Sequence, residues 1–350
     1  MKRSGLIKYC LSLLLALAYF DGAMSGQTSA PTADLLKEGQ AALDRGDFEH
    51  AIQDFQQARQ SAPQNLQANR GLLLSYLQAG RLNDAEQLGR EAVAHWPDDA
   101  QLQHWLGLVY FKSQQNAAAA LQTLRRAEQL DGTRFEVHFD LALVLLDQNQ
   151  YAPAAEELEK ANKLKPTDTL VHLLLGRAYQ NTNRTVQAIE QFHTALRLDP
   201  TVPLGHYHLG FAYASLGRNQ DAIAEYEKEL KRSPDNPKVL YQLGHSLLEA
   251  GDEKSAIADL KKATEFEPQN GEAFYDLGKA LLLAGNAEAA VSALHRSVEL
   301  KPTDPSPHYQ LARALDKMGQ RGQAQVEWQR FAQLKQAQPQ TGGMATGRVQ

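Results

Sequence analysis

Histidines in the segment HYHLG, residues 206–210, are the first candidates for metal chemistry. Residues two apart on a helix point in different directions, so His206 and His208 cannot bind one ion together. Counterparts of His206 in the same repeated frame are His138, His172 and His308. These residues belong to different repeats and are too far apart to coordinate one tetrahedral ion. We expect them to pack between helices. We therefore predict no metal site and no cofactor.

No catalytic motif fits its surroundings. The segment GHSLLEAG, from Gly244, begins like the G-x-S-x-G nucleophile elbow, but Leu248 replaces the closing glycine. That elbow also needs a strand–turn–helix context, whereas this segment has helix–helix spacing. The sequence holds no G-x-x-x-x-G-K-[ST] phosphate loop and no H-E-x-x-H zinc motif. We predict that the protein is not an enzyme and has no small-molecule substrate.

Composition argues against a nucleic-acid partner. Of the 350 residues, 22% are charged and 43% hydrophobic, as in ordinary soluble proteins. The formal net charge is −5, whereas a nucleic-acid partner would favour a basic face. We predict no nucleic acid among the partners.

Tyrosines and prolines recur with a constant period of about 34 positions, which indicates a repeated structural unit. The frame HYHLG returns as LYQLG, FYDLG and HYQLA, from Leu240, Phe274 and His308. Prolines keep the same period at Pro63, Pro97, Pro166, Pro200, Pro234, Pro268 and Pro302. Pro97 and Pro166 are separated by two periods plus one position, with Gly132 in the missing place, so one repeat carries a single insertion.

Each period predicts two helices. Leucine, glycine and tyrosine at i, i+1 and i+4 share one helical face, as at Leu209, Gly210 and Tyr213. An alanine and a large residue four later, such as Ala290 and Leu294, mark a second helix, which the proline stops. The glycine inside the first helix costs about 1 kcal/mol relative to alanine. We expect close approach of the paired helix, through the small alanine, to compensate this cost.

Residues that tolerate a left-handed backbone stand at the joint between the two helices of a period. They are Gly46, Gly80, Gly217, Gly251, Gly285, Gly319, Asn149 and Asn183. In the third period Gln114 holds this place. We predict a longer or distorted turn there, with Asn116 in the left-handed conformation.

This pattern resembles the tetratricopeptide repeat (TPR), in which W-x2-L-G-x2-Y, A-x3-F and a terminal proline follow one another within each repeat. The resemblance implies an all-α fold, a right-handed superhelical solenoid of antiparallel helix pairs, continuous over residues 33–338. It predicts nine repeats, near 33–65, 66–99, 100–134, 135–168, 169–202, 203–236, 237–270, 271–304 and 305–338.

The two ends of the chain differ from the repeats. Residues 1–25 combine a cationic start with an apolar run and small residues, the pattern of a secretory signal peptide, and 26–32 would be a short linker. The apolar run is about half of what a membrane-spanning helix needs, so we expect no stable membrane insertion after cleavage. We predict export, to a bacterial periplasm or out of the cell. Glutamines in the last repeat predict a polar cap, and 339–350 a disordered tail.

The resemblance implies a concave groove lined by the first helix of each pair. One row of this face carries aromatic residues, and a second row lies four residues further along. The predicted groove residues are Phe139, Tyr207, Phe211, Tyr241, His245, Tyr275, Lys279, Tyr309 and Arg313. Rings beside histidine, lysine and arginine suit an extended peptide with acidic groups or a free carboxylate, although simple packing would also explain the tyrosines.

Two specialised TPR ligand sites do not match. The asparagine ladder of glycosyltransferase-type arrays is absent, and Lys279 and Arg313 only approximate the carboxylate clamp of chaperone-binding arrays. The sequence predicts a non-catalytic, exported scaffold or adaptor that binds a partner protein or peptide in its groove. The alternative is an assembly subunit of an envelope or secretion complex that acts through its convex face or its ends. Homo-oligomerisation is left open.

Overall fold

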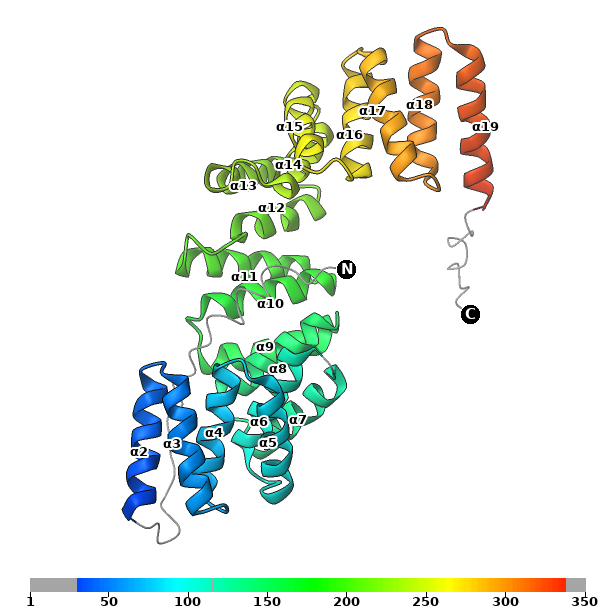
Figure 1. Ribbon diagram of the computed structural model, residues 1–350. Helices are drawn as coiled ribbons and strands as arrows, with labels where there is room; N and C mark the ends of the chain where they lie inside the picture. Colours follow the sequence, from blue (N-terminus) through cyan, green and yellow to red (C-terminus); the bar gives the residue numbers. More distant parts are fainter. Residues whose placement is uncertain (1–29, 115, 338–350) are drawn as a thin grey trace, which may run out of the picture. The chain divides into compact units, whose positions relative to one another are not determined.

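The computed structural model describes residues 30–114 and 116–337 (Figure 1). These residues form 18 helices and no strand. In chain order they are α2 (Ala30–Asp44), α3 (Phe48–Ser61), α4 (Leu66–Gln78), α5 (Leu82–His95), α6 (Ala100–Ser113), α7 (Ala117–Leu130), α8 (Phe135–Asp147), α9 (Tyr151–Leu164), α10 (Thr169–Asn181), α11 (Thr185–Leu198), α12 (Gly205–Ser215), α13 (Asn219–Arg232), α14 (Pro237–Glu249), α15 (Glu253–Phe266), α16 (Gly271–Leu283), α17 (Ala287–Leu300), α18 (Pro305–Lys317) and α19 (Arg321–Ala337). The predicted all-α fold of paired adjacent helices is confirmed.

The chain divides into two compact units at Gln187 and Ala188. Within each unit, every helix packs mainly on its neighbours in the sequence (Figure 1). The predicted signal peptide and tail lie outside the described residues, and the continuous solenoid over 33–338 stays a prediction. None of the described helices combines the length and the apolar character that crossing a membrane would need.

Side-chain caps mark where ten of the described helices begin. An aspartate or asparagine before the helix accepts a hydrogen bond from a backbone N–H of the first turn, which stabilises a helix by about 1 kcal/mol. These N-caps are Asp47, Asn65, Asp99, Asn116, Asp168, Asn236, Asp252, Asn270, Asn286 and Asp304. The repeated boundaries therefore follow from local sequence, before any packing is considered.

The joints between paired helices adopt the left-handed conformation as predicted, with one correction. All six joint glycines and both joint asparagines have positive φ. In the third repeat, however, Gln114 itself is left-handed with φ 60°, whereas Asn116 has φ −149°. Asn116 instead caps α7, its side chain accepting from the Ala119 N–H at 2.9 Å. The prediction for Asn116 was therefore wrong, because its side chain is used at the helix start.

The glycines inside the first helices are close-contact positions, and most of the nearest atoms belong to the large residue of the paired helix. A Cβ added at Gly278 would lie 2.5 Å from Cγ of Leu294, and one at Gly244 would lie 2.6 Å from Cγ of Leu260. The paired helix therefore approaches through its large residue, four positions after the alanine. The expected close approach is present, and at Gly210 it includes the backbone oxygen of Ala222, 3.1 Å from an added Cβ.

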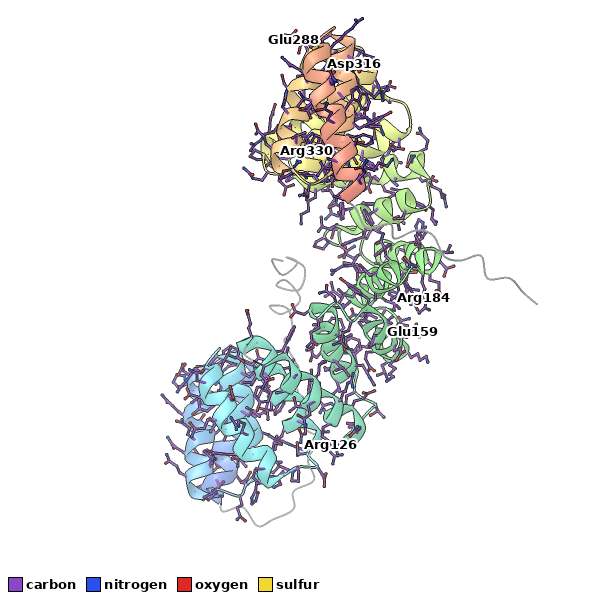
Figure 2. The ribbon with its side chains drawn as sticks, turned by 90° about the vertical axis from the view of Figure 1, so that its right-hand side faces the viewer. Arg126, Glu159, Arg184, Glu288, Asp316 and Arg330 are labelled. Atoms are coloured by element: carbon purple, nitrogen blue, oxygen red, sulfur yellow. The ribbon has the colours of Figure 1, made fainter. Side chains whose placement is uncertain are left out.

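Neighbouring repeats are also linked by polar contacts. The Tyr179 hydroxyl on α10 donates to Glu159 on α9 at 2.7 Å, and Arg184 lies 3.9 Å from the Tyr179 ring centroid. Figure 2 shows Arg184 beside Glu159, to which it is ion-paired at 3.4 Å. Burial and the bond to Glu159 raise the pKa of Tyr179 to about 12, so the hydroxyl keeps its proton. Tyr76 and Tyr213 make equivalent links to Gln56 and His193, which lie on the second helix of the preceding repeat.

A second set of bonds closes the loops between repeats in unit 1. A polar side chain early in each first helix lies within hydrogen-bond distance of the backbone carbonyl six residues before it. The four pairs are Asn69 with Pro63, Gln103 with Pro97, His138 with Gly132 and His172 with Pro166, at 2.9–3.0 Å. His138, His172 and His308 are buried, which agrees with the packing role expected for this frame.

Candidate functional site

Two rows of side chains in unit 2 form the candidate site, which we call the groove surface. The aromatic row is Tyr207, Tyr241, Tyr275 and Tyr309, one residue on each of α12, α14, α16 and α18. The second row, four residues later on the same helices, is Phe211, His245, Lys279 and Arg313. Phe211 and Tyr309 are each 37% exposed, and the other six are partly exposed. All eight residues therefore keep some surface that a ligand could touch.

The matching positions of unit 1 are more closed. The buried positions are Leu74, His104, Phe139, Leu143 and Leu173, each at most 4% exposed, whereas the partly exposed ones are Leu36, Gln40, Arg70, Leu108 and Arg177. On α4, α6, α8 and α10 at least one of the two positions is therefore buried. Phe139 stacks on Phe135, with ring centroids 5.5 Å apart. Phe139, predicted as a groove residue, thus packs inside unit 1, and the groove surface does not include it.

The tyrosines of the groove surface also pack against neighbouring rings. The Tyr207 ring centroid lies 6.4 Å from that of Phe211 and 6.1 Å from that of Tyr226. At α18, the Tyr309 ring lies 5.3 Å from the rings of both Trp328 and Phe331. The Tyr207 and Tyr309 rings are therefore held by packing on one side, which limits the side-chain entropy that a ligand contact would cost.

The hydroxyls of Tyr207 and Tyr241 stay protonated at ordinary pH. Burial raises the pKa of Tyr207 and of Tyr241, and the nearby Asp276 carboxylate adds to the rise at Tyr241. A neutral phenol can both donate and accept a hydrogen bond. These two residues therefore offer a ligand apolar ring faces together with neutral polar groups, and no negative charge of their own.

Two of the three basic residues on the groove surface are already paired with carboxylates. His245 Nδ1 lies 2.8 Å from Asp276 Oδ2, and Lys279 Nζ lies 2.8 Å from Glu249 Oε1. Both pairs join α14 to α16. The partner acids were not identified from the sequence, although their signal is regular: the paired residues are 31 and 30 positions apart, slightly less than one repeat. These pairs leave little free positive charge at the centre of the surface.

Arg313 is the exception among the basic residues. It donates to the Gln310 Oε1 at 3.1 Å, and its guanidinium carbon lies 5.8 Å from the centroid of the Tyr309 ring. In the described part of the chain no carboxylate pairs with it. At the position where Glu249 serves Lys279, thirty residues earlier, Arg313 has Leu283. The α18 end of the groove surface therefore has an unneutralised guanidinium.

We expect the contribution of His245 to stability to fall as the pH rises. The hydrogen bond to Asp276 raises the pKa of His245, partly opposed by burial, while Glu249 favours and Lys279 disfavours the charged ring. A group whose pKa is raised in the folded state contributes its full stabilisation below its unfolded-state pKa, about 6.5 for histidine. This contribution is lost as the pH rises through the folded-state pKa. Thermal unfolding should therefore show a larger loss of melting temperature for His245→Gln at pH 5.5 than at pH 8.5. An equal loss at both pH values would contradict a charged His245–Asp276 pair.

Comparison with known proteins gives a consistent family. Two family models match, both described as tetratricopeptide repeat: one over residues 36–100 and 173–237, the other over 111–178 and 247–305. No curated protein matches the chain.

Several solved structures have folds similar to that of this chain. The APC/C hetero-tetramer Cut9–Hcn1 aligns with a TM-score of 0.53 and 18% identity, over 80% of this chain and 55% of that chain. The C-terminal part of a Cytophaga hutchinsonii TPR repeat-containing protein aligns with a TM-score of 0.53 and 17% identity, over 69% of this chain and 96% of that chain. The pilF protein of Pseudomonas aeruginosa aligns with a TM-score of 0.52 and 20% identity, over 61% of this chain and 97% of that chain. At such identities the likeness shows the fold alone.

Proposed function

The chain belongs to the tetratricopeptide-repeat family, and from this premise we propose that it is a non-catalytic scaffold that binds an extended segment of a partner protein along the groove surface. The contrast between the two units carries the proposal. On α4, α6, α8 and α10 of unit 1 at least one of these two positions is buried, whereas both remain accessible on four successive first helices of unit 2. Aromatic side chains with exposed ring faces are typical anchors in protein interfaces.

The chemistry of the surface specifies what the segment must offer. Apolar side chains of the segment would lie on the exposed ring faces of the aromatic row, and its backbone would bond to the neutral hydroxyls. His245 and Lys279 are occupied by Asp276 and Glu249, so an acidic group has only Arg313 to bind without breaking a pair. We propose that the segment places an acidic side chain or a free carboxylate at the α18 end.

Selection from a random peptide display library on the full-length chain tests this proposal, because the selection does not require the partner to be identified first. The selected peptides are then titrated against the parent and against Tyr275→Ala and Arg313→Ala. Truncating an interface anchor costs about 1–2 kcal/mol, so affinity should fall roughly 5- to 30-fold for each variant. Arg313→Ala should selectively weaken peptides that carry a carboxylate.

Phe266→Ala is the matched control, because Phe266 is also an exposed aromatic residue but lies on α15, outside the groove surface. It should leave peptide affinity unchanged. Peptides that bind Tyr275→Ala and Arg313→Ala as tightly as the parent would overturn the proposal. A melting temperature measured for every variant separates lost binding from lost folding.

We further propose that the protein acts outside the cytoplasm. The support is the signal-peptide pattern of residues 1–25, which lie outside the described residues. Mass spectrometry of the protein from its native organism checks this directly. A mature chain that retains residues 1–25 would contradict it.

A further inference from the structure

A histidine, an acid and a base form the same cluster in two repeats, and a third repeat holds its histidine–acid part. On α8 and α9, His138 Nδ1 lies 2.7 Å from Glu157 Oε2, and Lys160 Nζ lies 2.9 Å from Glu157 Oε1. On α12 and α13, His206, Glu225 and Lys228 repeat the arrangement, each contact at 2.6 Å. On α18 and α19, His308 and Glu327 lie 2.6 Å apart. The shared part of the cluster is thus a packing device of this chain.

Among the described residues, the first cluster alone has a second carboxylate within metal-ligand distance of its histidine and acid. Glu128 on α7 places its Oε1 3.8 Å from His138 Nδ1 and 2.5 Å from Lys160 Nζ. Ten residues before the equivalent histidines, the other two clusters have Leu196 and Val298. An acid whose side chain is 23% exposed therefore replaces an apolar residue at this one place. The fold does not require it there, since the other two clusters form without it.

Backbone contacts orient the His138 ring for binding a cation. Its Nε2 lies 2.9 Å from the Gly132 carbonyl oxygen, which can only accept, so Nε2 carries a proton. The proton between Nδ1 and Glu157 must leave before Nδ1 can offer its lone pair to an ion. A histidine fixed by a carbonyl through one nitrogen while the other binds is the usual arrangement at metal sites.

We propose that Glu128, His138 and Glu157 form a binding site for a divalent transition-metal ion of the zinc type. Their ligand atoms lie within 4.8 Å of one another. One imidazole nitrogen and two carboxylate oxygens are ligands that zinc accepts, with water in the fourth position. A pocket of about 490 Å³, lined in part by Glu128, His138 and Lys160, opens on the cluster and gives the ion access.

In the metal-free state, Lys160 supplies the positive charge that the two carboxylates need. Its ammonium contacts both Glu128 and Glu157, while nearly half of its side-chain surface is exposed, so it can swing into solvent. Binding of the ion displaces this ammonium and the proton held between His138 and Glu157, so zinc uptake releases a proton. The ion and Lys160 therefore compete for one position.

Zinc titration of the metal-free full-length chain, against a competing chromophoric chelator, tests the site. Glu128→Leu introduces the residue that the α12–α13 cluster has at this position, Leu196, so the variant should fold normally. It should weaken zinc binding at least roughly 10- to 100-fold, the usual cost of losing a residue that only supports a metal ligand. Lys160→Met should bind zinc more tightly than the parent because the competing ammonium is gone. Leu196→Glu should add a second zinc equivalent in the α12–α13 cluster.

The three variants distinguish a built site from adventitious binding. All 11 histidines are retained in each of them, so binding to surface histidines stays constant. Zinc affinity that is the same in Glu128→Leu and the parent, or weaker in Lys160→Met, would overturn the proposal. Glu128→Gln is the second test should Glu128→Leu lower the melting temperature without metal, and it too must lose zinc binding and the zinc-dependent rise in melting temperature.

Discussion

Replacing Phe55 with alanine is expected to lower the free energy of unfolding by about 3–5 kcal/mol, the usual cost of removing a buried phenylalanine. Phe55 on α3 is 1% exposed. Its ring fills the space above two glycines, since a Cβ at Gly71 or Gly39 would lie only 2.4 or 3.0 Å from ring atoms. Neither glycine has a side chain that could fill the cavity left by the ring. Urea denaturation followed by circular dichroism measures the loss.

Phe266→Ala makes the same chemical change where the ring is 51% exposed on α15. It should alter the free energy of unfolding by no more than about 0.5 kcal/mol, as surface substitutions usually do. If both phenylalanines cost the same, burial between glycine faces is not what makes Phe55 important.

Gly278→Leu is the second large expected effect, at about 3 kcal/mol of destabilisation, the upper end of the range for overpacking. Leu294 is fully buried, and its Cγ would lie only 2.5 Å from a Cβ added at Gly278. Even the first atom of a new side chain would therefore clash. The α16–α17 pair must therefore separate, and in a repeat array that disturbs the contact with each neighbour. Thermal unfolding should show a lower melting temperature.

Gly322→Leu provides the matched control on α19. A Cβ there would meet no atom within 4 Å, and its φ is not positive. Removing a glycine from an open helical site should stabilise by up to about 1 kcal/mol. Destabilisation of similar size at both sites would show that leucine itself, and not the contact with Leu294, is responsible.

The helices and their joints could be predicted because each depends on local sequence. The constant period of the prolines and tyrosines places each helix pair, and glycine or asparagine marks most of the joints. The left-handed conformation was predicted for Asn116 but is found at Gln114, for a physical reason. Asn116 tolerates the left-handed conformation better, but its side chain is worth more as the cap of α7, so the strained position falls on Gln114.

The candidate site was predictable in position but not in accessibility or charge. The two rows of unit 2 follow from the repeat frame alone. The burial of Phe139 depends on how the helices of unit 1 pack, which the frame does not contain. The partners of His245 and Lys279 come from adjacent repeats, with a shift of three or four residues from the period. That shift depends on how the first helices of adjacent repeats pack against each other, so it cannot be predicted from the residue pattern within one helix.

The tyrosine links between repeats imply an order of events in hydrogen exchange. Tyr76, Tyr179 and Tyr213 each join a first helix to the preceding repeat, whereas Leu247, Leu281 and Leu315 hold this position in the last three repeats. Those leucines have no hydroxyl to make the link. In their place, His245–Asp276 and Lys279–Glu249 join α14 to α16. We therefore expect amide protons of α18 and α19 to exchange with solvent at a lower opening free energy than those of α12 and α13, with fraying that starts at the carboxyl-terminal repeat.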